Sequence, residues 1–479
     1  MLRSFAILTL GCKVNQYESQ QIRQLLETFG LAQANAADTP QLVVVNTCCV
    51  THTASAKSRH LINQAQKHGP QAVVVCGCLP TVETDELKAL GENVHVVKNR
   101  CDLAATLSRL AHTESTAPDS ARLTPVSAGV TSSPYLHPTD IFIRPESDAK
   151  VKCEKDLCPS DELPPLVSFQ NQTRAFLKIQ DGCDAFCYYC IIPTARPIVR
   201  YKNSEEILAE AAALVAAGHK EIVLTGVHIG SYGQTTARRR RWPTAENPHL
   251  PALLDQIAKI PGLARIRLSS LDPADVTPAL LDVFYAHPNL MPHLHLSFQS
   301  GSDAVLRRMA RPYTADDFRA KVALIRSRLD RPAITTDIIV GFPGETDADF
   351  DQTLALAKEV AFAKMHVFAF SSRKGTAAAR MQPKVPAEVK KARSRTLRDL
   401  DVILQRQFRS QFLGETAQVL IESTNGHAGG RAERYFEVEI ADRPHSSDQS
   451  YRSYSSGDIV AARLEENAAS SVLATAMDS

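Results

Sequence analysis

The chain has 479 residues, more than one ordinary domain holds, and we expect about two to four domains. Hydrophobic residues make up 44% of the chain and charged residues 22%, the profile of a soluble globular protein, and no run approaches the about 20 apolar residues of a membrane helix. A net charge of +2 demands no nucleic-acid partner, so evidence for such a partner must come from local patterns.

The cysteine content indicates metal or redox chemistry. The chain has 11 cysteines, and its N-terminus shows no long apolar core with a small-residue cleavage site. We therefore expect no signal peptide and a cytoplasmic protein. Cysteines in such a protein are more often metal ligands or reactive thiols than parts of a disulfide framework.

Residues 1–111 alternate strand and helix patterns. The β-rich runs Phe5–Leu10, Leu42–Val45 and Val73–Val75 are separated by helical stretches, which predicts an α/β domain with a parallel sheet covered on both faces. A cysteine follows each run, where open α/β sheets place their ligands. These cysteines are Cys12, Cys48 and Cys78, although their neighbours Cys49 and Cys76 keep the choice of ligands open.

Residues 112–173 differ in composition from the rest. They hold 8 of the 27 prolines, among many Ser, Thr and acidic residues. This composition predicts a linker or a weakly ordered insertion. Cys153 and Cys158 lie within it, and because no second cysteine pair is nearby, incidental thiols are the favoured interpretation.

Residues 174–383 carry six strand patterns, most of them followed by a helical stretch. Six βα units fall short of the eight of a complete barrel, which predicts a partial (βα)6 TIM-like barrel with its functional groups at the C-terminal ends of the strands. The strands are expected at Ala175–Gln180, Glu221–Thr225, Arg265–Ser269, His293–Phe298, Ile334–Val340 and Met365–Phe370.

A CxxxCxxC motif follows the first of these strands. Cys183, Cys187 and Cys190 can ligate three corners of a 4Fe–4S cluster, which leaves one iron with an open position. This pattern is typical of radical S-adenosylmethionine (SAM) enzymes, in which the open iron chelates SAM and electron transfer cleaves it to a 5′-deoxyadenosyl radical. Tyr189, before the third cysteine, is the aromatic residue expected near the adenine of SAM. A zinc site is the competing interpretation, which the strand context disfavours.

The last part of the chain changes character twice. Residues 384–411 predict a basic helical connector, in which eight Lys or Arg outnumber three acidic residues. Residues 412–479 contain short alternating strand patterns at Ala417–Ile421, Tyr435–Ile440 and Asp458–Leu464, which predict a small β-barrel. That barrel has 5 Arg against 11 acidic residues, an unexpected balance for a nucleic-acid module.

Segments spread over most of the first 381 residues resemble the radical SAM methylthiotransferases, and within them the tRNA threonylcarbamoyladenosine branch. LTLGCKVNQYES, from residue 8, favours this branch. The further matching segments are VVNTCCVTHTASAKSR (44–59), CGCLPT (76–81), FLKIQDGCDAFCYYCIIPTAR (176–196), EIVLTGVHIGSYG (221–233), RIRLSSLDP (265–273), HLHLSFQSGSDAVLRRMARPYT (293–314), TTDIIVGFPGET (335–346) and HVFAFSSRKGTAAARM (366–381).

The resemblance implies an N-terminal methylthiotransferase domain, a radical SAM core and a C-terminal TRAM-like barrel that helps to hold RNA. It implies two 4Fe–4S clusters, the second held by Cys12, Cys48 and Cys78, because the family patterns Asn-Thr-Cys and Gly-Cys favour Cys48 over Cys49 and Cys78 over Cys76. The implied reaction inserts sulfur at carbon 2 of N6-threonylcarbamoyladenosine, at position 37 of tRNA, and methylates it. One SAM serves as methyl donor and another as radical source.

The resemblance also implies a SAM pocket and partners. The expected partners are the tRNA anticodon stem–loop and a reductant such as flavodoxin or ferredoxin, and no membrane association is expected. The sequence identifies neither the sulfur donor nor a catalytic acid or base. For each polar residue expected in the SAM pocket, a structural ion pair is as good an interpretation as a catalytic role. The residues expected in the SAM pocket are Tyr189, Gln299, Ser300, Gly301, Arg311 and Asp337.

The chain departs from the family pattern at several positions. Pro197 stands where Gly is usual, Ile198-Val199 replace small or basic residues, His228 replaces an Asn, and Asp272 replaces a Glu. These departures bear on substrate contacts and not on cluster binding. The run Arg238–Arg241 predicts either a solvated loop or a phosphate contact, and we expect it and the basic connector to hold more of the RNA than the acidic barrel does.

Three other functions remain as hypotheses. Two lie within the family: methylthiolation of isopentenyl-adenosine in tRNA, and methylthiolation of an aspartate in a ribosomal protein. The third is a non-catalytic iron–sulfur redox or scaffold protein, which the intact CxxxCxxC motif in its barrel context disfavours.

Overall fold

The structure is a computed structural model that describes residues 2–35, 38–67, 69–83, 87, 90–112, 163–238, 246–424, 427–441 and 454–477. Most of the expected linker, with Cys153 and Cys158, and the arginines at 239–241 lie outside these ranges. None of the helices within the described ranges combines the length and the apolar character needed to cross a lipid bilayer.

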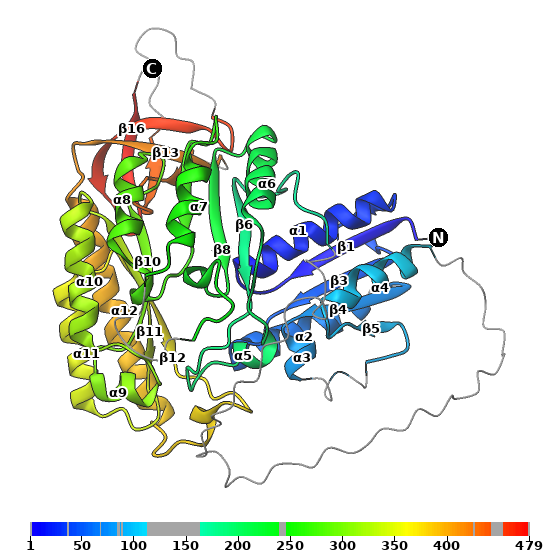
Figure 1. Cartoon of the computed structure of the whole chain (residues 1–479), viewed down its shortest axis with the longest axis horizontal. Helices are drawn as coiled ribbons and strands as arrows, with labels where there is room; N and C mark the ends of the chain where they lie inside the picture. The colour runs from blue at the N-terminus through cyan, green and yellow to red at the C-terminus, as the bar shows by residue number, and fades with distance from the viewer. Residues whose placement is uncertain are drawn as a thin grey trace.

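The N-terminal part is a sheet of five parallel strands in the order β2-β1-β3-β4-β5 (Figure 1). β3 is a fully buried run of mostly β-branched residues, as the central strand of a two-sided sheet requires. The predicted parallel α/β sheet is confirmed, and β2 and β5 are short strands that the sequence patterns missed. The strands are β1 (Ser4–Thr9), β2 (Ala32–Gln33), β3 (Leu42–Thr47), β4 (Ala72–Gly77) and β5 (Val94–Val96).

Helices cover both faces of this sheet. Alternate residues of its strands point to opposite sides, and because both sets are apolar, both faces need a cover. Val44 and Val74 pack with α1 (Lys13–Thr28) and α4 (Cys101–His112). Val43, Val45, Val73 and Val75 pack on the other face with α2 (His52–Lys67) and the one-turn helix α3 (Leu79–Val82).

The middle part is the predicted partial barrel, and all six expected strands are present. They form two parallel ladders, β6-β8-β9 and β10-β11-β12, joined by single bridges from Ile266 to Leu290 and from Leu271 to Leu296. A two-residue antiparallel strand, β7 (Arg200–Tyr201), edges the first ladder. The six strands are β6 (Arg174–Asp181), β8 (Glu221–Gly226), β9 (Arg265–Leu268), β10 (His293–Gln299), β11 (Ala333–Val340) and β12 (Lys364–Ala369).

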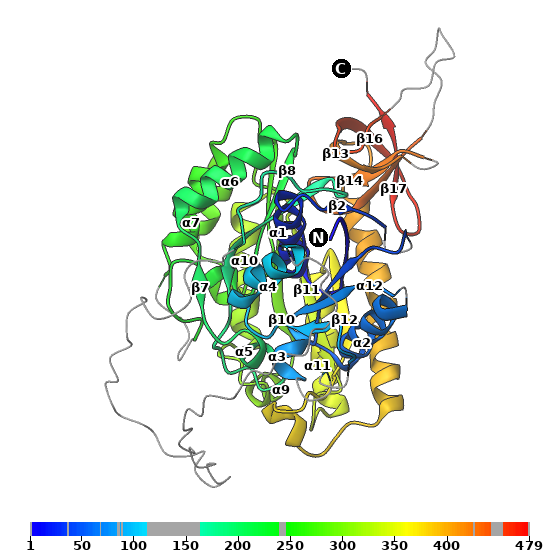
Figure 2. The same ribbon diagram turned by 90° about the vertical axis from the view of Figure 1, so that its right-hand side faces the viewer.

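Helices surround these strands on the outside (Figures 1 and 2). Several begin with a side-chain cap: Thr314 and Thr346 each form a capping box with an Asp three residues later. The helices are α6 (Ser204–Ala216), α7 (His249–Ala258), α8 (Pro278–Ala286), α9 (Asp303–Arg308), α10 (Ala315–Arg328) and α11 (Asp347–Val360). The one-turn helix α5 (Ile192–Ala195) contacts α3 of the N-terminal part instead.

The connector predicted at 384–411 is the long helix α12 (Ala387–Ser410), which leads to a closed five-stranded barrel (Figure 2). Two of its cations are buried: Arg393 pairs with Glu345 and Asp347, and Arg409 donates to Asn467. These two side chains stabilise the fold and do not face solvent. The barrel strands are β13 (Thr416–Ser423), β14 (Gly429–Arg431), β15 (Glu437–Ile440), β16 (Ile459–Asn467) and β17 (Val472–Ala476), of which β14 and β17 were not predicted.

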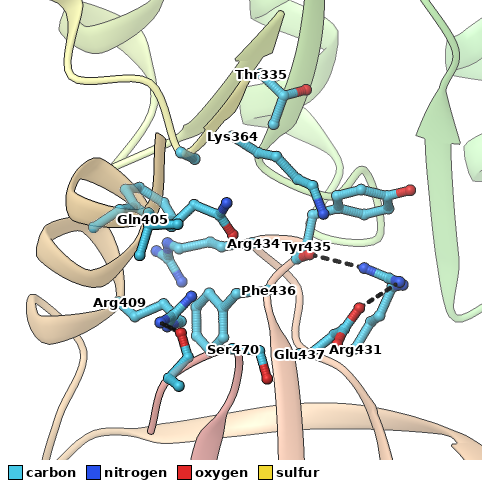
Figure 3. Close-up of a pocket in the computed structure, with 14 residues that line it drawn as sticks. Thr335, Lys364, Gln405, Arg409, Arg431, Arg434, Tyr435, Phe436, Glu437 and Ser470 are labelled. Atoms are coloured by element: carbon cyan, nitrogen blue, oxygen red, sulfur yellow. Dashed lines mark hydrogen bonds and ion pairs between the residues drawn. The ribbon is translucent and has the colours of Figure 1, made fainter. Parts of the chain in front are cut away.

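Tyr435 joins this C-terminal barrel to the base of the (βα)6 barrel. Its ring stacks on His293 with centroids 4.2 Å apart, and the guanidinium carbons of Arg267 and Arg431 lie 5.2 and 4.7 Å from its centroid. Figure 3 shows the junction, a cavity of about 240 Å³ between α12, β11, β12 and the C-terminal barrel. Because aromatic and cationic groups from both barrels meet here, the junction fixes one barrel on the other.

The N-terminal sheet contacts the (βα)6 barrel through α1, which lies against β6 and β8. Tyr17 of α1 is fully buried in the barrel's core, and its hydroxyl donates to Glu210 at 2.5 Å. Leu166 and Phe169, in the described end of the expected linker, join the same core. This contact brings the carboxyl ends of the two sheets toward each other.

Candidate functional site

Three cysteines lie at one edge of the N-terminal sheet. From β1 the chain adds β2 on one side of the sheet and then β3, β4 and β5 on the other. The loops that follow β1, β3 and β4 lie at the carboxyl edge, where doubly wound sheets bind ligands. Cys12 occupies the N-cap position of α1 and is exposed, Cys48 directly follows β3, and Cys78 occupies the N-cap position of α3. The sequence prediction of a cysteine just past each of these strands is therefore correct.

Hydrogen bonds between the first two loops fix this edge. The side-chain amide of Asn15 donates to Asn46 Oδ1 at 3.1 Å and to the carbonyl of Thr47 at 2.9 Å, and Asn46 donates back to the carbonyl of Asn15 at 2.9 Å. Gly77 has φ +91° and approaches so closely that an added Cβ would lie 2.4 Å from the Thr47 carbonyl oxygen. The residues beside the cysteines therefore hold the loops in register.

The three thiols influence one another electrostatically. Burial raises the pKa of Cys48 to about 11, and the charges of Cys78 and Cys12 add to this effect. The pKa of Cys78 is lowered to about 6 because Cys49 hydrogen-bonds to it, and Arg196 adds to the stabilisation of the thiolate. A cluster's sulfur ligands are thiolates, and the lowered pKa of Cys78 favours its thiolate form.

The two competing cysteines have other surroundings. Cys49 is fully buried, and its thiol donates to the carbonyl of Cys78 at 3.5 Å. Cys76 lies within β4 and packs into the core between the sheet, α1 and α4, on the opposite face from Cys49 and Cys78. Burial raises its pKa to about 12. Cys76 thus resembles a core thiol.

The second triad lies in the loop after β6. Gly182, with φ +75°, lets this loop pass so close to the chain at Ile198 that a Cβ there would lie 1.8 Å from the Ile198 carbonyl oxygen. The N–H of Cys183 donates to the carbonyl of Arg196 at 3.0 Å, and the N–H of Cys190 donates to the carbonyl of Cys187 at 3.0 Å. These bonds curl the CxxxCxxC segment into one tight loop.

Arg311 lies beside this second triad. Its Nη1 donates to Cys187 Sγ at 3.3 Å, its Nη2 pairs with Asp272 at 2.5 Å, and its Nε donates to the Tyr313 hydroxyl at 3.0 Å. Asp272, which replaces the usual Glu, therefore still reaches a partner. Burial raises the pKa of Tyr189 well above its usual value, and the charge of Cys187 adds to this effect. Of the predicted SAM-pocket residues, Arg311 and Tyr189 thus lie at the cysteines.

The other predicted SAM-pocket residues separate into two groups. Ser300 and Gly301 directly follow Gln299, which has φ +70°, and both contact Thr353 of α11. The Thr353 hydroxyl accepts from the Gly301 N–H at 3.0 Å and lies 3.3 Å from the Ser300 hydroxyl. Asp337 pairs with His295 across β10 and β11 at 3.3 Å.

Asp337 belongs to a polar cluster inside the barrel. Burial raises its pKa, but the hydrogen bond from His295 and the charges of His295, His366 and Lys13 outweigh burial and leave the pKa below its usual value. Lys13 directly follows Cys12 and is half-buried. The charge of a lysine in the N-terminal part therefore acts on this cluster of the (βα)6 barrel.

Arg238 is the one described member of the predicted four-arginine run. It pairs with Asp184 at 3.0 Å, and its guanidinium carbon lies 4.4 Å from the Phe186 ring centroid. Both partners lie in the CxxxCxxC loop. The phosphate contact predicted for the run stays a prediction.

Sequence reasoning missed an ion-pair network that joins the two triads. Arg196 pairs with Glu18 of α1 and Asp181 of β6, and its Nε lies 3.4 Å from Cys78 Sγ. Its only sequence signal is the position of Arg196 shortly after the last cysteine and of Asp181 shortly before the first. A cavity of about 390 Å³, lined also by Cys76, Arg100 and Pro197, opens beside this network.

Each triad offers cysteine sulfur, the usual ligand of iron–sulfur clusters. Within the described ranges, no three His, Cys, Asp or Glu side chains converge as the ligands of one ion do. In a 4Fe–4S cluster each cysteine binds the iron at a different corner. The second triad lies in one loop and the first on three loops at one sheet edge, and in each a guanidinium beside one sulfur offsets the negative charge of thiolate ligands.

Comparisons with known proteins agree with this geometry. Residues 177–357 match the Radical SAM superfamily, and residues 4–98 match the Uncharacterized protein family UPF0004. Among curated relatives, the threonylcarbamoyladenosine tRNA methylthiotransferase MtaB of Bacillus subtilis is 35% identical, over 88% of this chain and 85% of its own length. The protein of the same name from Thermotoga maritima is 36% identical, over 88% and 87%.

A second group of relatives is named for another substrate. The tRNA-2-methylthio-N(6)-dimethylallyladenosine synthase of Neorickettsia sennetsu is 30% identical, over 100% of this chain and 93% of its own. Among solved structures, the radical SAM methyltransferase TsrM from Kitasatospora setae has a TM-score of 0.51 at 16% identity, covering 79% of this chain and 74% of its own. That likeness shows the fold.

Proposed function

The chain belongs to the family of MtaB threonylcarbamoyladenosine tRNA methylthiotransferases, and from this membership we propose how its two cysteine triads divide the work. It is a radical SAM enzyme that methylthiolates threonylcarbamoyladenosine in tRNA. An iron–sulfur cluster and SAM are its cofactors. The relatives that act on dimethylallyladenosine are less similar, at 29–30% identity, and do not favour that substrate.

Two clusters, one on each triad, are the arrangement we propose. Cys183, Cys187 and Cys190 hold the cluster that binds SAM. The cluster and SAM, when bound, together supply the radical. Cys12, Cys48 and Cys78 hold an auxiliary cluster at which the sulfur is presented to the base. The observation that carries the proposal is that one residue, Arg196, contacts a member of each triad: its Nε lies beside Cys78 Sγ, and its carbonyl accepts from the Cys183 N–H.

The chain's own residues then have separate tasks. Arg311 donates to Cys187 Sγ and offsets the negative charge of the radical-generating cluster. The polar cluster of His295, Asp337 and His366 lines the inside of the barrel beside Lys13 and is available to orient the base. Threonylcarbamoyladenosine carries a carboxylate, and the Lys13 ammonium, next to Cys12, offers this carboxylate a counter-charge.

The proposed RNA contact is the anticodon stem–loop, with nucleotide 37 reaching the junction. The exposed cations of α12 and the Arg238 loop are proposed as phosphate contacts. Because the substrate is tRNA, we place the reaction in the cytoplasm and expect the electron from a small reductant such as flavodoxin or ferredoxin.

The direct test uses the reconstituted full chain, SAM, a reductant and two anticodon stem–loop RNAs. One RNA carries threonylcarbamoyladenosine at position 37, and the other carries dimethylallyladenosine there. Mass spectrometry of the digested RNA should find the methylthio product on the first RNA and not on the second, together with 5′-deoxyadenosine. Release of 5′-deoxyadenosine without a methylthio product on either RNA contradicts the proposed function.

A further inference from the structure

Arg196 makes contacts with both cysteine triads, one through its main chain and one through its side chain. Its carbonyl oxygen accepts from the Cys183 N–H at 3.0 Å, while its Nε lies within hydrogen-bond distance, 3.4 Å, of Cys78 Sγ. The two cysteines belong to different sheets and are 105 positions apart in the sequence. One residue thus spans the junction between them.

The rest of the guanidinium is held by two carboxylates. Nη2 donates to Glu18 Oε2 at 2.8 Å and Nη1 to Glu18 Oε1 at 2.7 Å, a two-point contact, while Nη1 also lies 2.8 and 2.9 Å from the two oxygens of Asp181. The side chains of Arg196 and Glu18 are 12% and 6% exposed. A planar guanidinium held at this many points has little freedom to turn away from the sulfur.

The two carboxylates come from the two parts that must dock. Glu18 lies on α1 of the N-terminal part, and Asp181 ends β6, directly before Gly182 and Cys183. Each is also held by a second cation: Lys178 lies 3.2 Å from Asp181 and 3.6 Å from Glu18. The position of Arg196 therefore depends on correct docking, and the position of Cys78 relative to Cys183 depends on Arg196.

We propose that Arg196 is a positioning residue that fixes the auxiliary cluster relative to the radical-generating cluster and tunes its reduction potential. The inference rests on the two-cluster arrangement proposed above. Hydrogen bonds to cluster sulfurs and nearby charge are two means by which proteins set cluster potentials. A positive donor stabilises the reduced, more negative cluster, so loss of Arg196 makes the auxiliary cluster harder to reduce.

The test measures the auxiliary cluster alone. The parent protein is the full chain with Cys183, Cys187 and Cys190 replaced by Ala, reconstituted with iron and sulfide. R196Q, R196K and K202Q are introduced into it, and the cluster is titrated with reductant at controlled potential and followed by electron paramagnetic resonance. Lys202 is the matched control because it also crosses the junction, to Tyr17 at 2.6 Å, and the main partners of its ammonium are Tyr17 and Glu210.

R196Q should lower the ratio of reduced to oxidised cluster at least tenfold at a fixed potential, which is about 59 mV for a one-electron couple. R196K, which keeps the charge but not the planar fork, should fall between R196Q and the parent, and K202Q should titrate with the parent. R196Q titrating with the parent, or K202Q shifting as far as R196Q, overturns the inference.

Two further outcomes are also decisive. If R196Q does not fold, R196K is compared with the parent instead. An R196K cluster with a paramagnetic resonance spectrum and a reduction potential identical to those of the parent overturns the inference. If the parent itself binds no iron, the two-cluster proposal fails and the inference fails with it. A parent that binds a cluster whose potential Arg196 does not affect leaves the proposed function standing and removes only the inference.

Discussion

Arg311 donates a hydrogen bond from Nη1 to Sγ of Cys187 at 3.3 Å, and Arg196 lies in the same way beside Cys78. Each cysteine triad therefore has one buried guanidinium at one of its sulfurs. Each guanidinium is in turn held by carboxylates, Asp272 in the first case and Glu18 with Asp181 in the second. A guanidinium beside a sulfur offsets the negative charge of a thiolate, as the proposed two-cluster arrangement requires.

Replacing Arg311 with Gln should destabilise the cluster-free protein. The change removes the ion-pair partner of Asp272, whose side chain is only 7% exposed, and breaking a buried pair from one side costs about 3–5 kcal/mol. Chemical denaturation followed by circular dichroism measures the effect. The double variant R311Q/D272N should recover part of the loss, and a single variant as stable as the natural protein would show that the pair contributes nothing.

Substitutions of single cysteines should separate two partial activities. C183A should abolish 5′-deoxyadenosine formation, since its triad holds the cluster that binds SAM. C78A should keep 5′-deoxyadenosine formation and lose the methylthio product. C76A, whose thiol packs on the opposite face of the sheet from Cys78, serves as the matched control and should retain both activities, and loss of the methylthio product in C76A would reassign the ligand.

Charge reversal on α12 should weaken tRNA binding. Lys391, Arg395 and Arg398 are exposed, whereas Arg393 and Arg409 are buried and are left unchanged. The triple variant K391E/R395E/R398E should bind tRNA more weakly, and the slope of log affinity against log salt should fall by about 0.7–0.9 for each phosphate that the helix no longer neutralises. Filter binding at several salt concentrations measures this. K259E, at the exposed residue directly after α7, is the control, and an unchanged slope in the triple variant rejects α12 as a phosphate-binding element.

Replacing Lys13 with Gln should reduce discrimination between substrates. The variant loses the half-buried cation beside Cys12 that we assign to the substrate's carboxylate, and removing a charged hydrogen bond costs about 1.5–3 kcal/mol, or about tenfold to a hundredfold in affinity. Binding of stem–loop RNA with and without the threonylcarbamoyl group measures the ratio. Equal ratios for K13Q and the natural protein would exclude Lys13 from recognition.

Local sequence patterns were sufficient for much of the fold. The N-terminal strands β3 and β4 are largely continuous, buried apolar runs, and the barrel strands β9 and β10 alternate polar and apolar residues; both patterns are typical of strands. The strands that were missed, β2, β5, β14 and β17, are short or half-exposed, so their hydrophobic pattern is weak. Their pairing is decided by neighbours far away in the chain.

The candidate site was predictable only where residues are close in sequence. Cys183, Cys187 and Cys190 form one motif and were found from spacing, whereas the partners of Arg196 come from α1 and β6 and meet only after docking. Asp337 and Arg311 were both assigned to the SAM pocket from the motifs that contain them. In the structure Asp337 pairs with His295, and Arg311 pairs with Asp272. Side-chain direction at the barrel mouth depends on packing that a single sequence does not encode locally.

The central claim is that this chain methylthiolates threonylcarbamoyladenosine in tRNA. Mass spectrometry of the tRNA nucleosides from a strain that lacks the gene tests it most directly. The account predicts that 2-methylthio-threonylcarbamoyladenosine disappears, that its unmethylthiolated precursor accumulates, and that the gene restores the product while a C183A version does not. Undiminished 2-methylthio-threonylcarbamoyladenosine in the deletion strain would contradict the claim.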